Sequence, residues 1–124
     1  MNKALICLGA NIASADANIE GATEFLATLG TINKATPLYR TAPEHCGDVA
    51  PYLNRVVELH TTAEYDEIHN ATKHYEKRIR EHHASAPFVA VDIDIVLWNG
   101  MILRAADANS QYFRQGCRMI DQTF

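Results

Sequence analysis

Two aspartates one residue apart carry the clearest chemical signal in the sequence. Asp92 and Asp94 lie in an alternating apolar stretch that predicts a β-strand over residues 89–98. Side chains two residues apart in a strand point to the same face, so both carboxylates are expected to stand together. They would repel each other unless a cation offset their charge, and Mg²⁺ shared with substrate phosphates is the natural partner. The alternative is that both carboxylates decorate a solvated sheet face.

A basic cluster precedes the two aspartates. Residues 73–83 read KHYEKRIREHH, with four Lys or Arg and three His against two Glu. If the chain folds back after this cluster, Lys77, Arg78 and Arg80 lie across from the carboxylates. Phosphoryl transfer needs cations in such a place, because its catalysis depends on positioning and charge stabilisation. The alternative is a solvated helix end whose cations complement the helix dipole, and it is favoured for the two adjacent histidines.

A second group of side chains flanks a long loop. Residues 41–51 contain two prolines and a glycine, so they cannot form a regular element. Thr41 begins this loop, and Tyr52 and Asn54 follow it. An aromatic face beside an amide can hold a flat heterocycle by stacking and paired hydrogen bonds. The alternative is that Tyr52 is an edge residue that covers the loop.

Hydrophobic periodicity predicts the elements that position these side chains. Helices are expected from about residue 17 to Gly30, and from about Glu64 into the basic cluster. Strands are expected over residues 3–9, 31–40, 53–61 and 89–98. Asn99-Gly100 predicts a two-residue hairpin turn. The order β-α-β-β-α-β favours an α+β sandwich of the ferredoxin-like type, with a mainly antiparallel sheet and helices on one face, which leaves the other face for a site.

Composition limits the class of protein. The chain has 124 residues, 48% of them hydrophobic and 21% charged, which indicates one globular domain over residues 1–124. No apolar run reaches the roughly 18–20 residues that cross a bilayer, so no membrane is expected as a partner. A formal charge of −4 argues against nucleic-acid binding. Three widely spaced cysteines suit free thiols, and with no signal peptide they indicate a cytoplasmic protein.

Four segments, taken in order, resemble the 6-hydroxymethyl-7,8-dihydropterin pyrophosphokinase family of folate synthesis. LGAN at residues 8–11 is similar to the family's LGSN, and LYRTAP at 38–43 matches its most distinctive segment. YLNRVV at 52–57 resembles FLN-x-VV, and DIDIVL at 92–97 resembles DLDLLL. Order and approximate spacing agree over residues 4–100, so common ancestry is expected.

The resemblance implies a reaction and a set of functional residues. The family moves a pyrophosphoryl group from ATP to the pterin hydroxymethyl oxygen and releases AMP. In it, the counterparts of Asp92 and Asp94 are catalytic residues that hold two Mg²⁺ bridging the ATP phosphates. The residues that would bind the pterin are Thr41, Ala42, Tyr52 and Asn54. Those that would bind ATP are Glu76, Arg78, Arg80 and Tyr112, with Arg80 also catalytic.

One departure from the family pattern lies just before the aspartates. Val89 stands where the family has an arginine that contacts phosphate. A cation on the transferring group contributes several kcal/mol to catalysis. Slow turnover is therefore expected unless Arg80, His82 or His83 substitutes for it.

The C-terminal segment departs as well. Residues 110–114 read SQYFR near the place of the family's Pro-His motif, without the proline or the histidine. Phe113 is the candidate to replace an aromatic residue that stacks on the pterin. These departures support two alternatives to a divergent pyrophosphokinase. One is a pterin- or nucleotide-binding module without catalysis, and the other is a related phosphotransferase acting on another small alcohol.

Overall fold

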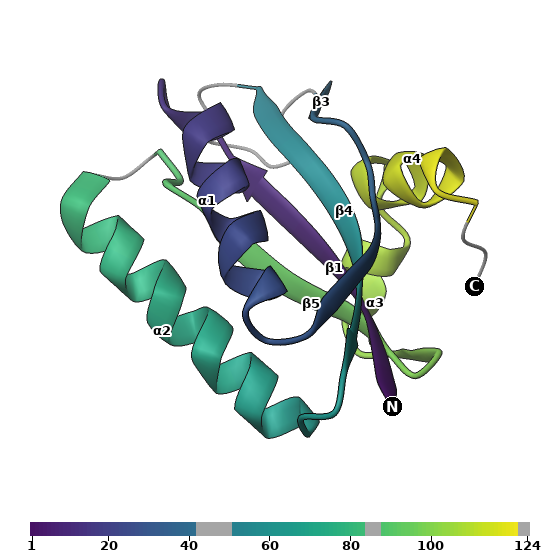
Figure 1. Ribbon diagram of the computed structural model, residues 1–124. Coiled ribbons are helices and arrows are strands. Elements are labelled where there is room, and N and C mark those ends of the chain that lie inside the picture. Colours follow the sequence, from purple (N-terminus) through teal and green to yellow (C-terminus); the bar gives the residue numbers. More distant parts are fainter. Residues whose placement is uncertain (42–50, 84–87, 122–124) are drawn as a thin grey trace.

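The computed structural model describes residues 1–41, 51–83 and 88–121. Within them the chain forms an α+β sandwich, in which an open antiparallel sheet carries helices α1 and α2 on one face (Figure 1). This confirms the predicted ferredoxin-like fold class. The elements are β1 (Asn2–Ala10), α1 (Ala15–Ala27), β2 (Thr31–Ala35), β3 (Tyr39–Thr41), β4 (Tyr52–Thr61), α2 (Tyr65–His83), β5 (Asp92–Trp98), β6 (Met101–Ile102), α3 (Ala105–Ala108) and α4 (Gln111–Met119).

The strands follow the order β2-β4-β1-β5-β6, and β3 also pairs with β4. One continuous segment over residues 31–40 was expected, whereas the structure has two strands there. Residues 36–38, which include Pro37, separate β2 from β3. Proline lacks the N–H that a continuous ladder would require. Both strands still pair with β4, so this segment covers one side of β4 along much of its length.

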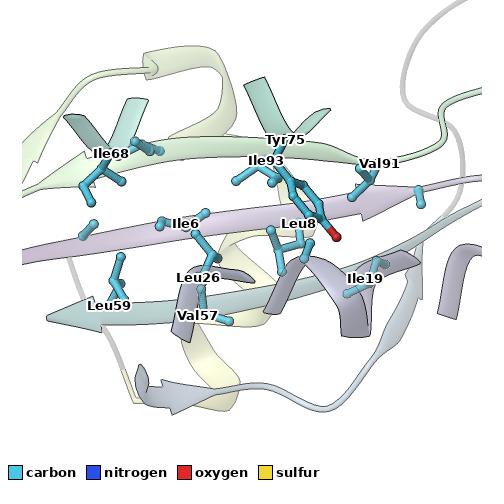
Figure 2. Close-up of a cluster of buried hydrophobic side chains, with 14 of the residues drawn as sticks. Ile6, Leu8, Ile19, Leu26, Val57, Leu59, Ile68, Tyr75, Val91 and Ile93 are labelled. Atoms are coloured by element: carbon cyan, nitrogen blue, oxygen red, sulfur yellow. The ribbon is translucent and has the colours of Figure 1, made fainter. Parts of the chain in front are cut away.

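The main hydrophobic core fills the space between the sheet and helices α1 and α2 (Figure 2). Ile19 and Leu26 project from one stripe of α1, as the spacing predicted, and both are fully buried. On α2, Ile68 is fully buried and Tyr75 is largely buried in the same core. Each fully buried aliphatic side chain contributes roughly 1.5–3 kcal/mol relative to an exposed one. This core therefore fixes both helices against the sheet, and with them the polar side chains that α2 carries.

Two turns show what glycine does in this fold. Asn99 and Gly100 have φ of 51° and 81°, which confirms the predicted hairpin turn between β5 and β6. Gly30 was expected to end α1, but α1 ends at Ala27, and Gly30 does not have the positive φ that is typical of a glycine at a helix end. A Cβ at Gly30 would lie 2.3 Å from the backbone oxygen of His60. Gly30 is therefore required by a close approach to β4.

The second face of the sheet is partly covered, although the sequence predicted it to be free. Helices α3 and α4 pack there on a second buried cluster: Leu5, Cys7, Val56, Val96, Leu97, Ala108, Phe113, Cys117 and Ile120. Gly116 allows the close contact, because a Cβ there would lie 2.3 Å from Val56 Cγ2. The hydroxyl of Tyr39 also donates a hydrogen bond to the backbone oxygen of Tyr112 at 2.6 Å. In the described part of the chain, no helix is long and apolar enough to cross a membrane.

Candidate functional site

Asp92 and Asp94 lie on the second face of the sheet, at the start of β5. Ile93 between them is fully buried in the main core, while both aspartates are half-buried. The register places Asp92 opposite Gly9 and Asp94 opposite Cys7 on the central strand β1. The two carboxylates therefore share a face, and the half of that face covered by α3 and α4 begins beside them.

Two cations approach Asp94, and they come from opposite ends of the site. Lys73 Nζ, on α2, lies 3.6 Å from Asp94 Oδ1. Arg104 Nη2, just before α3, lies 3.8 Å from the same oxygen. Arg104 is held in turn by Asp107, to which its Nε donates a hydrogen bond. Sequence reasoning singled out neither cation, because only the folded chain brings residues 73 and 104 to strand β5.

The free edge of β5 is closed by side chains of α2. Strand β6 pairs with β5 only at Leu97 and Trp98, so Ile93 has Leu8 of β1 opposite it on one side and no strand on the other. The N–H of Ile93 donates to Glu76 Oε1 at 2.9 Å, and Lys73 Nζ donates to the Ile93 oxygen at 3.1 Å. Lys73 also donates to Glu76 Oε1 at 2.9 Å. Glu76, a predicted ATP contact, is thus buried and bonded to the strand that carries the aspartates.

Burial makes the charged forms of both aspartates unfavourable. Desolvation, followed by repulsion from Asp94 and Glu76, raises the pKa of Asp92 to about 6. Desolvation also raises the pKa of Asp94, although Arg104 and Lys73 oppose this shift. A carboxylate with a raised pKa beside a second carboxylate is an environment in which a bound cation is stabilising.

The donor set fits a magnesium ion that takes its other ligands from a substrate. Asp92 and Asp94 offer carboxylate oxygens, which Mg²⁺ prefers. Within residues 1–41, 51–83 and 88–121, no group of three or more His, Cys, Asp or Glu side chains is placed to hold a metal ion. A dedicated all-protein cage is therefore not built from these residues. Mg²⁺ typically uses one or two carboxylates together with phosphates and water, and this pattern suits the pair.

The polar group predicted around the long loop is brought together beside the aspartates. Asn54 is buried on β4, and its Nδ2 donates to Thr41 Oγ1 at 2.7 Å. Thr41 pairs with Tyr52 across β3 and β4.

On the other side of Asn54, Gly9 of β1 lies between Asn54 and Asp92, since it is the register partner of both. Ala42, the fourth predicted pterin contact, lies outside the described residues.

Gly9 keeps the space between these groups open. A Cβ at this position would lie 3.4 Å from Asn54 Oδ1 and 3.5 Å from Tyr52 Cδ1. With glycine there, only backbone separates the amide of Asn54 from the carboxylate of Asp92 along this row of the sheet. The glycine of the LGAN segment at residues 8–11 therefore leaves room between Asn54 and Asp92, a role that the sequence analysis did not identify.

The other cations of α2 have different neighbours. Arg78 lies over the ring of Tyr75, 5.6 Å from its centroid, and so faces the α1 side of the helix. Arg80 and Lys77 are exposed. Arg80 follows Glu76 by one helical turn and therefore shares its side of α2. Among the described residues, none of these three cations forms an ion pair with Asp92 or Asp94, and Lys73 lies where the sequence analysis expected them.

Tyr112 is connected to the aspartates through two intermediates. Its hydroxyl donates to Asp107 Oδ1, and Asp107 binds Arg104, which lies beside Asp94.

Phe113, the candidate stacking residue, is fully buried in the second cluster. The faces of its ring are therefore closed to a ligand, and the expectation that it stacks on a pterin is wrong.

Asn11 ties the segment that enters β5 to the end of β1. Its backbone N–H donates to the oxygen of Val89 at 3.0 Å, and its Oδ1 accepts from the N–H of Val89 at 2.5 Å. Asn18 of α1 adds a bond from Nδ2 to the oxygen of Ala90 at 2.9 Å. These contacts fix where β5 begins, and therefore where Asp92 stands.

A pocket of about 640 Å³ lies near this end of the sheet, at the junction of β1 and α1. The residues that line it are Ala10, Asn11, Ile12, Ala13, Ala15, Asp16, Arg40, Pro51, Leu53 and Phe88. Among the described residues, neither aspartate lines it, nor do Thr41, Tyr52 and Asn54. Leu53 and Ala10 belong to the main core, so this hollow opens on the α1 side of the sheet.

Comparison with known proteins supports one family. The family model described as 7,8-dihydro-6-hydroxymethylpterin-pyrophosphokinase (HPPK) matches residues 5–119 of the 124-residue chain. The match therefore includes both aspartates, the group around Asn54 and the C-terminal helices. A search of curated proteins finds no match.

Proposed function

Because the chain belongs to the 7,8-dihydro-6-hydroxymethylpterin-pyrophosphokinase family, we propose that it transfers pyrophosphate from ATP to the hydroxymethyl oxygen of the dihydropterin and releases AMP. At the level of the family, this is the pyrophosphate transfer of folate synthesis. The proposal extends that reaction to this chain, with ATP and Mg²⁺ in the cytoplasm.

One observation carries the proposal: Asn54, Gly9 and Asp92 form a single row across three neighbouring strands. The row places an amide that is suited to a flat heterocycle about two strand spacings, roughly 10 Å, from a carboxylate that is suited to a metal-bound phosphate. A pterin held at Asn54 with its hydroxymethyl group on the side of Gly9 would bring that group to the aspartates. Transfer between two bound substrates needs this kind of juxtaposition.

Asn54, Thr41 and Tyr52 would bind the pterin. The hydrogen bond from Asn54 Nδ2 to Thr41 fixes the orientation of the amide. Asn54 Oδ1 is thereby turned toward Gly9, where a Cβ would lie 3.4 Å from it. The Tyr52 ring lies beside the same position and would provide a stacking surface. Ala42 remains part of this proposed pterin site.

Asp92 and Asp94 would hold two Mg²⁺ together with the phosphates of ATP. When bound, Mg²⁺ would supply charge neutralisation at the phosphate oxygens. The chain contributes the position of both carboxylates, through the bonds of Glu76 and Lys73 to Ile93. Glu76, Arg78, Arg80 and Tyr112 are the other proposed nucleotide contacts, and Arg80 would act on the transferring group. Arg78 would have to leave the ring of Tyr75 to reach the phosphates.

Release of AMP from ATP, measured with and without 6-hydroxymethyl-7,8-dihydropterin, tests the proposal. AMP that depends on the pterin, and that disappears in the double variant Asp92→Asn, Asp94→Asn, is the expected result. Absence of AMP at high concentrations of folded enzyme would overturn it.

A second candidate, a binding module without catalysis, is favoured by one observation. Val89 offers no cation at the entrance to β5, and its backbone is occupied by Asn11. This candidate predicts saturable binding of pterin or ATP with no AMP. Calorimetric titration of the wild-type protein with each ligand, run beside the AMP assay, tests this candidate: saturable binding without AMP supports it, and absence of binding to either ligand overturns it.

A further inference from the structure

Asp94 is already paired with cations that the chain itself supplies. Lys73 Nζ and Arg104 Nη2 lie 3.6 Å and 3.8 Å from the same carboxylate oxygen. Each cation is also held by an acid of its own, Lys73 by Glu76 and Arg104 by Asp107.

Asp92 differs from Asp94 in this respect. In the part of the chain that the structure describes, no cation lies within ion-pair distance of Asp92. The two carboxylates of the pair are therefore unequal before any ligand arrives, and a divalent cation that approaches Asp94 must compete with two positive charges.

We infer that Lys73 and Arg104 are internal counter-ions, which pair with Asp94 in the nucleotide-free protein and pair instead with a triphosphate when it binds with a divalent cation. The inference rests on the proposed function, because it takes Asp92 and Asp94 as the metal ligands. Lys73 acts on the metal through Asp94 and is thus a positioning residue. Metal and triphosphate then bind cooperatively. The triphosphate draws Lys73 and Arg104 away from Asp94, which frees this carboxylate for the metal, and the metal in turn releases the two cations for the phosphates.

The size of the effect follows from the geometry. A unit charge about 4 Å from a carboxylate interacts strongly with it at the effective dielectric constant of a protein surface. The side chain of Lys73 is 40% exposed, so solvent screens part of this interaction. We therefore expect removal of the Lys73 charge to change metal affinity by about tenfold, less than an unscreened pair would give.

The test uses Mn²⁺ as the probe, with free Mn²⁺ measured by electron paramagnetic resonance. Lys73→Gln removes the charge but keeps an N–H donor for Glu76 and Ile93, so the edge of β5 stays hydrogen-bonded. Relative to wild type, we expect Lys73→Gln to bind Mn²⁺ alone about tenfold more tightly. It should bind Mn²⁺ less tightly when a non-hydrolysable ATP analogue is present. Lys73→Arg, which keeps the charge, should resemble wild type in both titrations.

Lys77→Gln is the matched control. It removes one positive charge from an exposed position on the same helix, at a site that forms no ion pair among the described residues. Equal changes in Lys73→Gln and Lys77→Gln, or weaker binding of Mn²⁺ alone by Lys73→Gln, would overturn the inference. Thermal unfolding curves establish that each variant is folded.

The outcomes also separate this inference from the proposed function. Absence of Mn²⁺ binding in the wild type and in every variant would overturn both. The expected opposite changes without any release of AMP would support the counter-ion role and overturn the proposed catalysis.

Discussion

At the scale of single residues, Asp92 carries a charge that the fold disfavours. Its pKa is raised from 3.8 to about 6, first by desolvation and then by Asp94. Because the folded-state pKa lies above the unfolded one, the stabilising contribution of the protonated Asp92 is fully present below about pH 4 and is lost as the pH rises through about 6. Residues kept for function often reduce stability in this way.

Asp92→Asn should therefore stabilise the protein near neutral pH. We expect the free energy of unfolding to rise by about 1–3 kcal/mol at pH 7.5 and by clearly less at pH 4.5, where the wild-type carboxyl is largely protonated in the folded state. Urea titrations without divalent cations or nucleotide measure both values. The exposed Glu24→Gln controls for net charge, and an equal gain at both pH values would contradict the prediction.

Gly9 is the second residue whose type matters for the site. A methyl group there makes ordinary van der Waals contact with Asn54 and Tyr52, so Gly9→Ala should fold with nearly wild-type stability. The same methyl group would occupy the space between the Asn54 amide and the Asp92 carboxylate, where the pterin is proposed to lie. We expect pterin affinity to fall by about tenfold or more, measured by calorimetry, since one misplaced methyl group in a fitted pocket has that effect. Unchanged pterin binding would place the pterin elsewhere.

At the scale of elements, helix α2 serves strand β5 as a substitute for a neighbouring strand. Glu76 accepts a hydrogen bond from the N–H of Ile93, and Lys73 donates one to the Ile93 oxygen, so both backbone groups that have no strand partner are hydrogen-bonded. Unpaired strand edges are otherwise sites of fraying or association. The stretch of β5 between the two aspartates is thereby held on both sides.

Loss of this contact should loosen that stretch selectively. Glu76→Ala leaves the buried N–H of Ile93 without an acceptor, which costs about 1–3 kcal/mol of stability. We also expect faster hydrogen exchange at the Ile93 amide, followed by NMR. Glu76→Gln keeps a carbonyl oxygen at this place and should retain most of the protection. Equal exchange in the two variants would show that the carboxylate does not support β5.

At the scale of the whole molecule, the sheet has a core on each face, and the site lies where the second core ends. Helix α4 packs Phe113 against strands β1, β4 and β5, and the preceding helix α3 begins directly after Arg104. The placement of Arg104 beside Asp94 therefore depends on the packing of the C-terminal helices. The first core, under α1 and α2, places Lys73 on the other side of the same carboxylate.

Phe113→Ala should affect both stability and the site. Removal of a fully buried phenyl ring costs about 3–5 kcal/mol, measured by urea titration. We also expect weaker nucleotide binding at temperatures where the variant is folded, because α3 and Arg104 lose their support. The conservative Phe113→Leu should cost less and keep binding. Nucleotide affinity that is unchanged in Phe113→Ala would show that Arg104 is placed independently of this core.

The sequence alone determined the features that depend on neighbouring residues. Alternation of polar and apolar residues placed Asp92 and Asp94 on one face of a strand, and Asn99-Gly100 specified its turn. The order of amphipathic segments was sufficient for the fold class. The C-terminal helices were missed because they are short, with four and nine residues, and Gly116 lowers the helix propensity of the second.

Only the tertiary structure decided which side chains meet. The row of Asn54, Gly9 and Asp92 depends on the register of three strands that are far apart in the sequence. Lys73 and Arg104 reach Asp94 from opposite directions because two separate cores hold their helices. Local patterns determine the face on which a side chain lies, whereas its partner across space depends on packing and register, which no local pattern encodes.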